Sequence, residues 1–283
     1  MNTSVITVGI INLLLVLGLS PLLEGISRKL KALVHSRIGP PVIQPYYDLL
    51  KLIGKEDIQP QGMYISRIIP YFCFSAAATA ALLMPLGGSS APLNRAADAI
   101  AFIYLITLIA VGLIMTAAAS GNPFALVGAS REMMLQITVE PVLVIAVITA
   151  AINAGSFGMR EMGDWHYFHG PTMSMVIATA SLFLALQAQV GKLPFDMAEA
   201  ESEIAGGLFI EQSGPKYALM KWTMMAKQVI FTSVFVQIFI PWPRMGNFIL
   251  DILLHLAKVI GVVIIIGVID VVNPRLRIDQ AVK

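Results

Sequence analysis

Seven stretches of mainly apolar residues follow one another along the chain, each about twenty residues long and separated from the next by a polar loop. A helix needs roughly 20 apolar residues to cross the hydrocarbon core of a bilayer, so each stretch is long enough to span it. The pattern therefore predicts an all-α, polytopic membrane protein. The expected spans are 4–23, 68–86, 99–119, 134–154, 172–190, 222–241 and 249–270.

The composition supports this fold class, because 57% of the 283 residues are hydrophobic and only 13% are charged. Ordinary soluble domains carry about 25% charged residues. We find no internal repeat, linker or low-complexity segment, which predicts one integral membrane domain over residues 1–283. The net charge of +2 gives no indication of a nucleic-acid partner.

The sequence also lacks the residue sets of redox and hydrolytic centres. Its one cysteine is Cys73, whereas an iron–sulfur cluster takes about four thiolate ligands. The four histidines are scattered, and no HExxH, GxSxG, Walker A or GxGxxG motif occurs. We therefore expect no metal site and no cofactor in this chain.

The distribution of basic residues predicts how the chain sits in the membrane. Loops that follow the first, third, fifth and seventh spans carry 14 Lys and Arg residues, whereas the opposite loops carry only Arg95, Arg160 and Arg244. The positive-inside rule then places the N-terminus outside and the C-terminus in the cytoplasm of a multi-pass protein of the cytoplasmic membrane. The loops 24–67 and 191–221 become cytoplasmic. Basic charges follow the first span, which we expect to remain as an anchor.

The first cytoplasmic loop contains a predicted amphipathic helix. It opens with basic residues that include Arg28 and Arg37, and Gly39-Pro40-Pro41 then interrupts any helix. Apolar residues recur at helical spacing in the segment that follows, while Asp48 and two lysines face elsewhere. By pattern alone, a helix anchored in the membrane interface is favoured over a functional platform.

The second cytoplasmic loop is acidic. If it is helical, Asp196, Glu199 and Glu203 share one face, and crowded carboxylates raise one another's pKa values. Such a cluster stores and relays protons, whereas the simpler alternative is a solvated acidic loop. Apolar residues interleave with the charges and indicate partial burial. The five carboxylates of the loop are Asp196, Glu199, Glu201, Glu203 and Glu211.

Ionisable residues also occur within the spans. Glu132 precedes the fourth span and Glu140 interrupts it two turns later, where a charge at membrane depth indicates either a functional site or a side chain that reaches the surface. In the seventh span, Asp251, His255 and Lys258 form one helical stripe. The stripe either lines the protein interior or lies near the outer surface, and Lys258 is its deepest member.

Three segments carry a resemblance to a known family. They are PFDMAEAESEIAGGLFIEQSG at 194–214, the loop 28–56 with its Gly39-Pro40 pair, and PRLRIDQ at 274–280. In order, and over nearly the whole chain, they resemble the membrane subunit of the complex I superfamily that forms the quinone chamber and meets the hydrophilic arm. The segment SGNPFALVGASREMML at 120–135 resembles the hydrogenase branch, with Ech-type energy-converting nickel–iron hydrogenases and formate hydrogenlyase. Ser27 and Asp270 depart from the quinone branch, which usually has glutamate and arginine there.

The resemblance implies a subunit that anchors a soluble hydrogenase arm and couples its electron transfer to H⁺ or Na⁺ movement. The implied partners are the hydrogenase large and small subunits, a ferredoxin-like iron–sulfur subunit, an antiporter-like membrane subunit and the lipid bilayer, with no nucleic acid. The nickel–iron site and the iron–sulfur clusters would lie in these partners. The alternatives are the quinone-site subunit of an NADH or F420H2:quinone oxidoreductase, a free-standing ion transporter, and a purely structural anchor.

The same resemblance assigns roles to individual residues. Arg28, Arg37 and Asp48 are expected to dock the arm and to balance charge. A hydrated path would lead from the junction with the arm into the membrane. The residues expected to line that path are Glu132, Glu140, Asp196, Glu199, Glu201, Glu203, Glu211 and Lys258.

Overall fold

The computed structural model describes residues 3–58, 64–85 and 98–281, and all regular structure within these ranges is helical. Seven helices are long and apolar enough to cross a membrane, which confirms the predicted fold class and number of spans. These helices are α1 (Thr3–Val34), α3 (Tyr64–Leu83), α4 (Ala99–Ala119), α5 (Pro123–Ala154), α7 (Met173–Val190), α9 (Gly214–Phe239) and α10 (Phe248–Val272).

Three of these helices extend well beyond their predicted spans. α1 continues to Val34, α5 begins at Pro123, and α9 begins at Gly214. The predicted spans stopped where charged residues begin, but a helix continues past the hydrocarbon wherever its backbone is capped or packed. At the start of α5, the Asn122 side chain accepts a hydrogen bond from the Phe124 N–H at 2.9 Å, which caps the helix.

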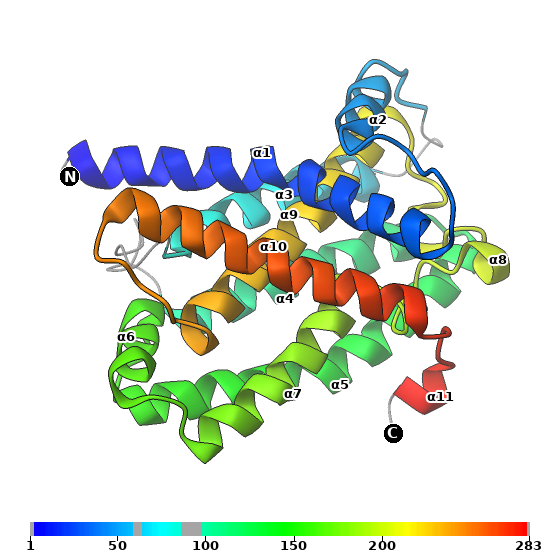
Figure 1. Cartoon of the computed structure of the whole chain (residues 1–283). Helices are drawn as coiled ribbons and strands as arrows, with labels where there is room; N and C mark the ends of the chain where they lie inside the picture. The colour runs from blue at the N-terminus through cyan, green and yellow to red at the C-terminus, as the bar shows by residue number, and fades with distance from the viewer. Residues whose placement is uncertain (1–2, 59–63, 86–97, 282–283) are drawn as a thin grey trace.

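Short helices mark the two ends of the molecule (Figure 1). α6 (Met159–His169) lies on the same side as the N-terminus, and we refer to this side as the α6 end. α2 (Gln44–Ile53), α8 (Glu201–Ile204) and α11 (Ile278–Ala281) lie toward the opposite side, the α2 end, where the chain also finishes. The sequence analysis did not predict α6, because its 11 residues are too few and too polar to form a span.

The predicted amphipathic helix after the first span is confirmed as α2. Pro45 and Leu49 are buried against the bundle, whereas Leu50 and Ile53 are exposed. Exposed apolar residues on a short helix at the end of a membrane bundle suit a position in the membrane interface or beneath a partner subunit.

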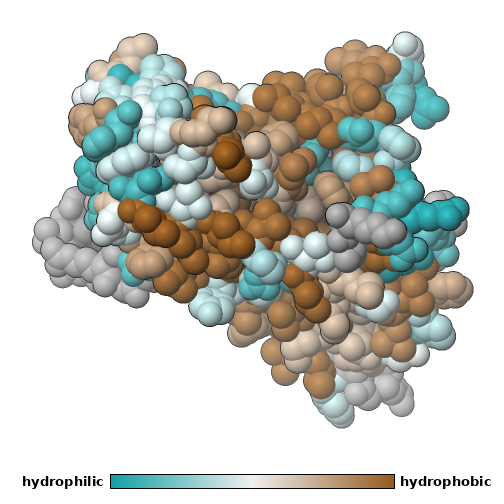
Figure 2. Space-filling view, turned by 90° about the horizontal axis from the view of Figure 1, so that it is seen from below, coloured by the Kyte–Doolittle hydropathy of each residue, from teal (hydrophilic) through white to brown (hydrophobic). Residues whose placement is uncertain are grey.

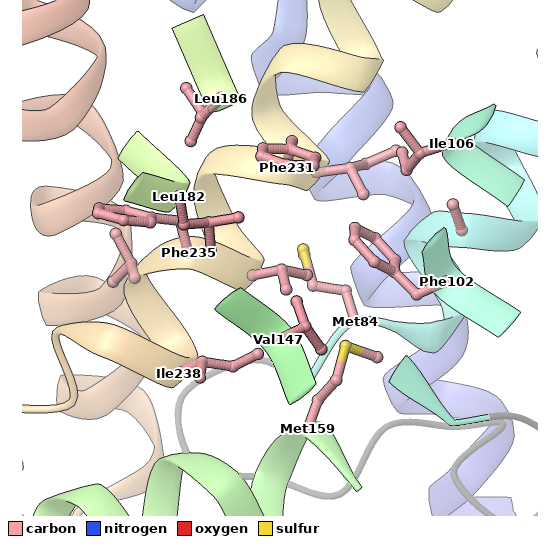
Figure 3. Packing of buried hydrophobic residues seen from close by; sticks show 14 of the residues in the cluster. Met84, Phe102, Ile106, Val147, Met159, Leu182, Leu186, Phe231, Phe235 and Ile238 are labelled. Carbon is pink, nitrogen blue, oxygen red and sulfur yellow. The ribbon is translucent and has the colours of Figure 1, made fainter. Parts of the chain in front are cut away.

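α9 is the central helix of the bundle. In its most apolar stretch 89% of the residues are buried, against 33–50% in the other six spanning helices, so the other helices surround it. Figure 3 shows Phe231, Phe235 and Ile238 of α9 in the core, together with Phe102 of α4 and Leu182 of α7. The residues of α9 are consequently shielded from lipid, whether they are apolar or polar.

The outer surface has the distribution expected of a protein in a bilayer. Figure 2 shows hydrophobic residues across the middle of one face and hydrophilic residues gathered toward its two sides. On α5, Ile137, Ile145 and Ile152 are each about two-thirds exposed or more, at spacings of eight and seven residues that place them on one helix face. This face of α5 is suited to contact with lipid or with a neighbouring membrane subunit.

Two glycines allow loops at the α2 end to approach helix backbones. A Cβ atom at Gly25 would lie 1.9 Å from the carbonyl oxygen of Val42, so the loop after α1 packs directly on that helix. A Cβ atom at Gly128 would lie 3.0 Å from the carbonyl oxygen of Ala198 and 3.1 Å from Gly207. The acidic loop therefore lies against the backbone of α5.

Candidate functional site

The acidic loop between α7 and α9 does not form the helix that would align its carboxylates. Residues 191–200 are irregular, and the loop then forms two short turns, the helical turn Glu201–Ile204 and the 3-10 turn Gly207–Phe209. Asp196, Glu199 and Glu203 therefore do not share a helix face, and that prediction is wrong.

The cause lies in the residues that open the loop. Gly191 adopts a left-handed conformation and ends α7, and Pro194 follows three residues later without an N–H to donate to a helix. The chain is thereby turned across the α2 end of the bundle. Backbone contacts hold it there, including a hydrogen bond from the Leu276 N–H to the Pro194 carbonyl at 3.1 Å.

The three carboxylates occupy three different environments. Asp196 forms an ion pair with Arg275 at 3.0 Å. Glu203 is exposed and forms an ion pair with Arg131 of α5 at 2.7 Å. Glu199 lacks an ion pair within 4 Å among the described residues and faces a group of cavities instead. Glu199 is thus the member of the acidic loop that is free to change its charge.

Glu199 lines three adjoining cavities at the α2 end, of about 160, 220 and 380 Å³. We refer to them together as the Glu199 cavity. Its walls come from α1, the acidic loop, the first turns of α9 and the last turns of α10. Its charged lining residues are Glu24, Arg28, Lys31, Lys192, Asp196, Glu199, Lys221 and Asp270.

Glu24 is the centre of an ion-pair network on one wall. Its carboxylate lies 2.7 Å from Lys192 Nζ and 3.3 Å from Arg28 Nε, and Arg28 also contacts Asp48 of α2 at 2.9 Å. The side chains of Glu24 and Lys192 are only 14% and 22% exposed. The network joins α1, α2 and the acidic loop, so it fixes the position of the cavity relative to the membrane-spanning helices.

Asp270 closes the opposite wall. Its carboxylate accepts a hydrogen bond from the Leu193 N–H at 2.9 Å and lies 3.3 Å from Lys31 Nζ. The end of α10 is thereby tied both to the acidic loop and to α1.

Burial raises the pKa of Glu199 from 4.5 to about 7, and the carboxylates of Asp196 and Glu132 add to this effect, while Lys192 and Lys221 oppose it. A carboxyl group with this pKa is about half protonated at neutral pH, which suits a group that accepts and releases protons. Burial also raises the pKa of Asp196. The cavity therefore contains carboxyl groups that are protonated more readily than ordinary ones.

Neighbouring groups keep their charges instead. Burial lowers the pKa of Lys192, but the nearby carboxylates of Glu24, Asp270 and Glu199 together outweigh burial and leave that pKa raised. The hydrogen bond from Arg131 holds the pKa of Glu203 below its usual range. Lys192 remains an ammonium and Glu203 a carboxylate near neutral pH, so Glu199 is the group whose charge varies.

Two further ionisable residues interact with Glu199 from the spanning helices. Glu132 of α5 and Lys227 of α9 interact electrostatically with it and with each other. Only 1% of Lys227 is exposed, and its Nζ has no hydrogen-bond partner in the described part of the chain. A buried lysine without a partner is costly at membrane depth, which indicates a functional role. Gln136 lies one turn beyond Glu132 and accepts a hydrogen bond from Gln189 of α7 at 2.9 Å.

Two more predicted path residues lie close to α5. One is further along the helix and the other is beside its start. Glu140 lies two turns beyond Glu132, about 12 Å along the helix, and accepts a hydrogen bond from Thr107 of α4 at 3.0 Å. Glu211 accepts a hydrogen bond from Asn122 at 2.7 Å, next to the first turn of α5. The structure therefore places Glu132 with Glu199, and Glu140 and Glu211 on either side of this pair along α5.

The remaining predicted residues are dispersed. Lys258 lies at the α6 end, far from the Glu199 cavity, where it binds backbone carbonyls after α9. Arg37 is exposed in the loop after α1, while Arg28 and Asp48 form the ion pair described above. The side chain of Glu201 lies outside the described residues.

Sequence analysis did not assign a role to three charged residues that line the cavity, Glu24, Lys192 and Asp270, or to Lys227 beside it. For Glu24 a signal was present, because it lies one helical turn before Arg28 and α1 continues through both. The resemblance drew attention to position 27, where Ser27 stands in place of glutamate. The structure shows that a Glu–Arg pair exists here after all, with its acidic member three residues earlier.

With this geometry established, the sequence was compared with known proteins, and residues 6–283 match the family described as NADH dehydrogenase. The chain belongs to the NADH dehydrogenase family. Among its curated relatives, formate hydrogenlyase subunit 4 of Escherichia coli (strain K12) is 34% identical over 95% of this chain and 91% of the relative. Hydrogenase-4 component C of the same organism is 36% identical over 81% and 74%.

A solved structure gives the same result for the fold. A chain in the membrane-bound sulfane sulfur reductase, described as an archaeal respiratory membrane complex, matches with a TM-score of 0.88 and 28% identity, over 99% of this chain and 93% of that one. This member of the NADH dehydrogenase family is therefore a multi-pass membrane subunit of an energy-converting complex, which confirms the resemblance. Such subunits act together with partner subunits.

Within residues 3–58, 64–85 and 98–281, no three side chains of His, Cys, Asp or Glu lie close enough together to hold a metal ion. Cys73 is buried against the carbonyl of Ile109. What the Glu199 cavity offers chemically is a titrating carboxyl group between fixed charges, with further ionisable groups leading into the bundle.

Proposed function

We propose that this chain anchors a soluble nickel–iron hydrogenase arm and couples the electron transfer of that arm to the movement of H⁺ or Na⁺ across the membrane. The hydrogenase branch is supported by two relatives, formate hydrogenlyase subunit 4 and hydrogenase-4 component C, and by the segment 120–135. The nickel–iron site and the iron–sulfur clusters belong, in this proposal, to the hydrogenase large and small subunits and a ferredoxin-like subunit. An antiporter-like membrane subunit lies beside the chain.

The proposed orientation places the α2 end in the cytoplasm and the α6 end outside. The basic loop residues gather on the loops of the α2 end, as the positive-inside rule requires of a cytoplasmic side. The exposed residues Arg37, Lys51 and Lys55, together with the apolar Leu50 of α2, then form the surface that receives the arm. Arg28 and Asp48 support that surface by joining α1 to α2.

The single observation that carries the coupling role is the position of Glu199. It lies between the loops that face the arm and the ionisable residues of the bundle, and its pKa of about 7 allows both protonation states to be populated at neutral pH. In the proposal, charge changes in the arm shift its protonation. The H⁺ or Na⁺ ion then passes along α5 through Glu132 to Glu140. Carboxylates of the same loop, Glu203 and Glu211 with Glu201, supply ions to the entrance.

The experiment that tests the function uses the intact complex, purified from membranes through a tag on this chain. We expect it to evolve hydrogen from reduced ferredoxin, and mass spectrometry of the co-purifying subunits to find hydrogenase large and small subunits. Reduction of a quinone analogue without hydrogen evolution would assign the chain to the quinone branch instead. Ion movement by the isolated chain in vesicles would indicate a free-standing transporter.

The orientation makes a separate prediction. In a Cys73→Ala background, cysteines introduced as Ile58→Cys and Ala205→Cys at the α2 end should react with a membrane-impermeant maleimide only from the cytoplasmic side. His169→Cys, on the exposed face of α6, should react only from outside. All three positions are chosen because their side chains are exposed, so access depends on the side of the membrane. The reverse labelling pattern would invert the proposed topology.

A further inference from the structure

A second polar site lies at the α6 end, away from the Glu199 cavity. His255 of α10 is buried, with 4% of its surface exposed, and its Nε2 forms a hydrogen bond with the Ser233 hydroxyl of α9. It lies seven residues, or about 10 Å of helix, inside the start of α10 at Phe248. An ionisable side chain at this depth is a functional-site hypothesis in its own right.

His255 lines a small cavity of about 20 Å³ between α10 and the loop that follows α9. A cavity needs about 10–15 Å³ to hold a water molecule, so this one accommodates a single water. Gln237 and Arg244 line the same cavity, and Gln237 Nε2 and Arg244 Nη2 have no hydrogen-bond partner within the described ranges of the chain. Only 4% of Gln237 is exposed. Two unpartnered donors on one small cavity form a water site.

The charged groups that face His255 are already engaged by other partners. Asp251, one turn before it, accepts a hydrogen bond from a backbone N–H at 2.7 Å, and Arg244 forms an ion pair with Asp164 of α6. Lys258 Nζ donates to the backbone carbonyls of Ile240, Pro241 and Pro243 at 3.1–3.2 Å. Charged groups that are held by other partners therefore frame the cavity, and His255 contributes the imidazole to its lining.

Polar side chains occur along α9 in the stretch between the Glu199 cavity and this site. Gln228 lines the Glu199 cavity, and its Nε2 has no partner among the described residues. Thr232 and Ser233 follow about one turn later, and Gln237 lies one turn beyond Ser233, all of them buried. Nine residues separate Gln228 from Gln237, which is about 14 Å of helix and close to half the thickness of the hydrocarbon core. Both amides are buried, so neither serves for contact with bulk water or lipid.

We propose that His255, Ser233 and Gln237 form a proton-release site through which this chain opens to the outer face. The inference rests on the proposed function and on its orientation. An imidazole takes up a proton at one ring nitrogen and releases one from the other. A proton that arrives beside Ser233 therefore leaves to the water of the cavity as hydronium, and the imidazole is neutral again. The chain then holds an outlet of its own beside that of the antiporter-like subunit.

The first test replaces the titrating group in the intact complex, in sealed vesicles that build a gradient. His255→Phe fills the space without titrating, and we expect it to lower the number of protons moved per electron pair by about twofold or more, with unchanged reduction of the iron–sulfur clusters. Ser233→Ala should have a smaller effect in the same direction. The matched control is His169→Gln, an exposed histidine at the same end, which should leave proton movement unchanged.

The second test reports access and does not depend on turnover. In a Cys73→Ala background, Gln237→Cys should react with a small cationic thiosulfonate reagent applied from the outer side of intact vesicles, and not from the cytoplasmic side. This labelling test also decides whether the outlet exists if the His255→Phe complex fails to assemble. Labelling that occurs only from the cytoplasmic side, or not at all in a complex that assembles, would overturn the proposed outlet.

The outcomes separate this inference from the proposed function. If Glu199→Gln stops gradient formation while His255→Phe leaves it intact, the coupling role stands and the outlet does not exist. If both variants build the parental gradient, both proposals are wrong. If both lower the gradient and Gln237→Cys reacts from outside, the outlet is established.

Discussion

In sealed vesicles, Glu199→Gln is expected to leave the complex assembled and its clusters reducible, and to lower ion gradient formation per electron pair by at least about tenfold. A positioned proton donor or acceptor contributes roughly 10²–10⁴-fold to a rate, so the loss of one is large even when other carboxylates remain. Glutamine keeps the shape and much of the hydrogen bonding of Glu199 while removing its titration. The effect should therefore fall on coupling and not on assembly.

Two further measurements accompany this prediction, a control variant and a pH titration of the Glu199 carboxyl group. Glu56→Gln removes an exposed glutamate at the same end and should leave the gradient unchanged. Infrared difference spectra should show a carboxyl group with a midpoint at about pH 7 that disappears in Glu199→Gln. Because Lys192 opposes the raised pKa of Glu199, Lys192→Met should move that midpoint upward. A Glu199→Gln complex that assembles and builds the parental gradient would show that the cavity carboxylates are structural.

The second large effect is expected when the Glu24–Lys192 ion pair is broken. Removing one member of a largely buried pair leaves the other without its partner and costs about 2 kcal/mol of folding free energy here. This is below the usual range because each remaining member keeps another charged neighbour, Arg28 beside Glu24 or Asp270 near Lys192. Glu24→Gln and Lys192→Met should each lower the midpoint of thermal unfolding of the solubilised complex. The double variant should recover part of the loss, since neither group is then unpaired.

The comparison for this pair is Arg277→Met, which removes an exposed arginine at the same end and should change the unfolding midpoint very little. If the losses of the two single variants simply add in the double variant, Glu24 and Lys192 do not stabilise one another. The contact between the two side chains would then make no contribution of its own to the stability of the complex.

The fold could be predicted well from the hydrophobic pattern alone, because a spanning helix can be recognised by the length of its apolar run. All seven spans and the amphipathic α2 are present. The ends of α1, α5 and α9 could not be placed, because these helices continue through charged turns that other segments cover. α6 was missed for the opposite reason, since 11 mixed residues carry neither the length of a span nor a clear period.

The candidate site was only partly predictable. Glu132 and Glu199 were both among the residues predicted to line the ion path, and the structure places them close enough to interact electrostatically. Their cationic partners could not be chosen from sequence, because Lys192 meets Glu24 across 168 positions of chain. The helical alignment of Asp196 with Glu203 failed because a pattern of spacing does not show that the backbone leaves the helix at Gly191 and stays irregular to residue 200.

The buried, polar character of α9 has a consequence for how the protein is made. Its mean hydropathy of 1.2 is the lowest of the seven spanning helices, and that of α10 is 2.7. Insertion of a nascent segment into a bilayer depends on its own transfer free energy, to which charged residues such as Lys227 contribute unfavourably. α9 alone is therefore a poor substrate for the translocon, and it depends on the helices synthesised before it, or on α10 after it, for a place in the membrane. During biosynthesis, the central helix of the bundle therefore enters the bilayer with the help of the outer helices that surround it.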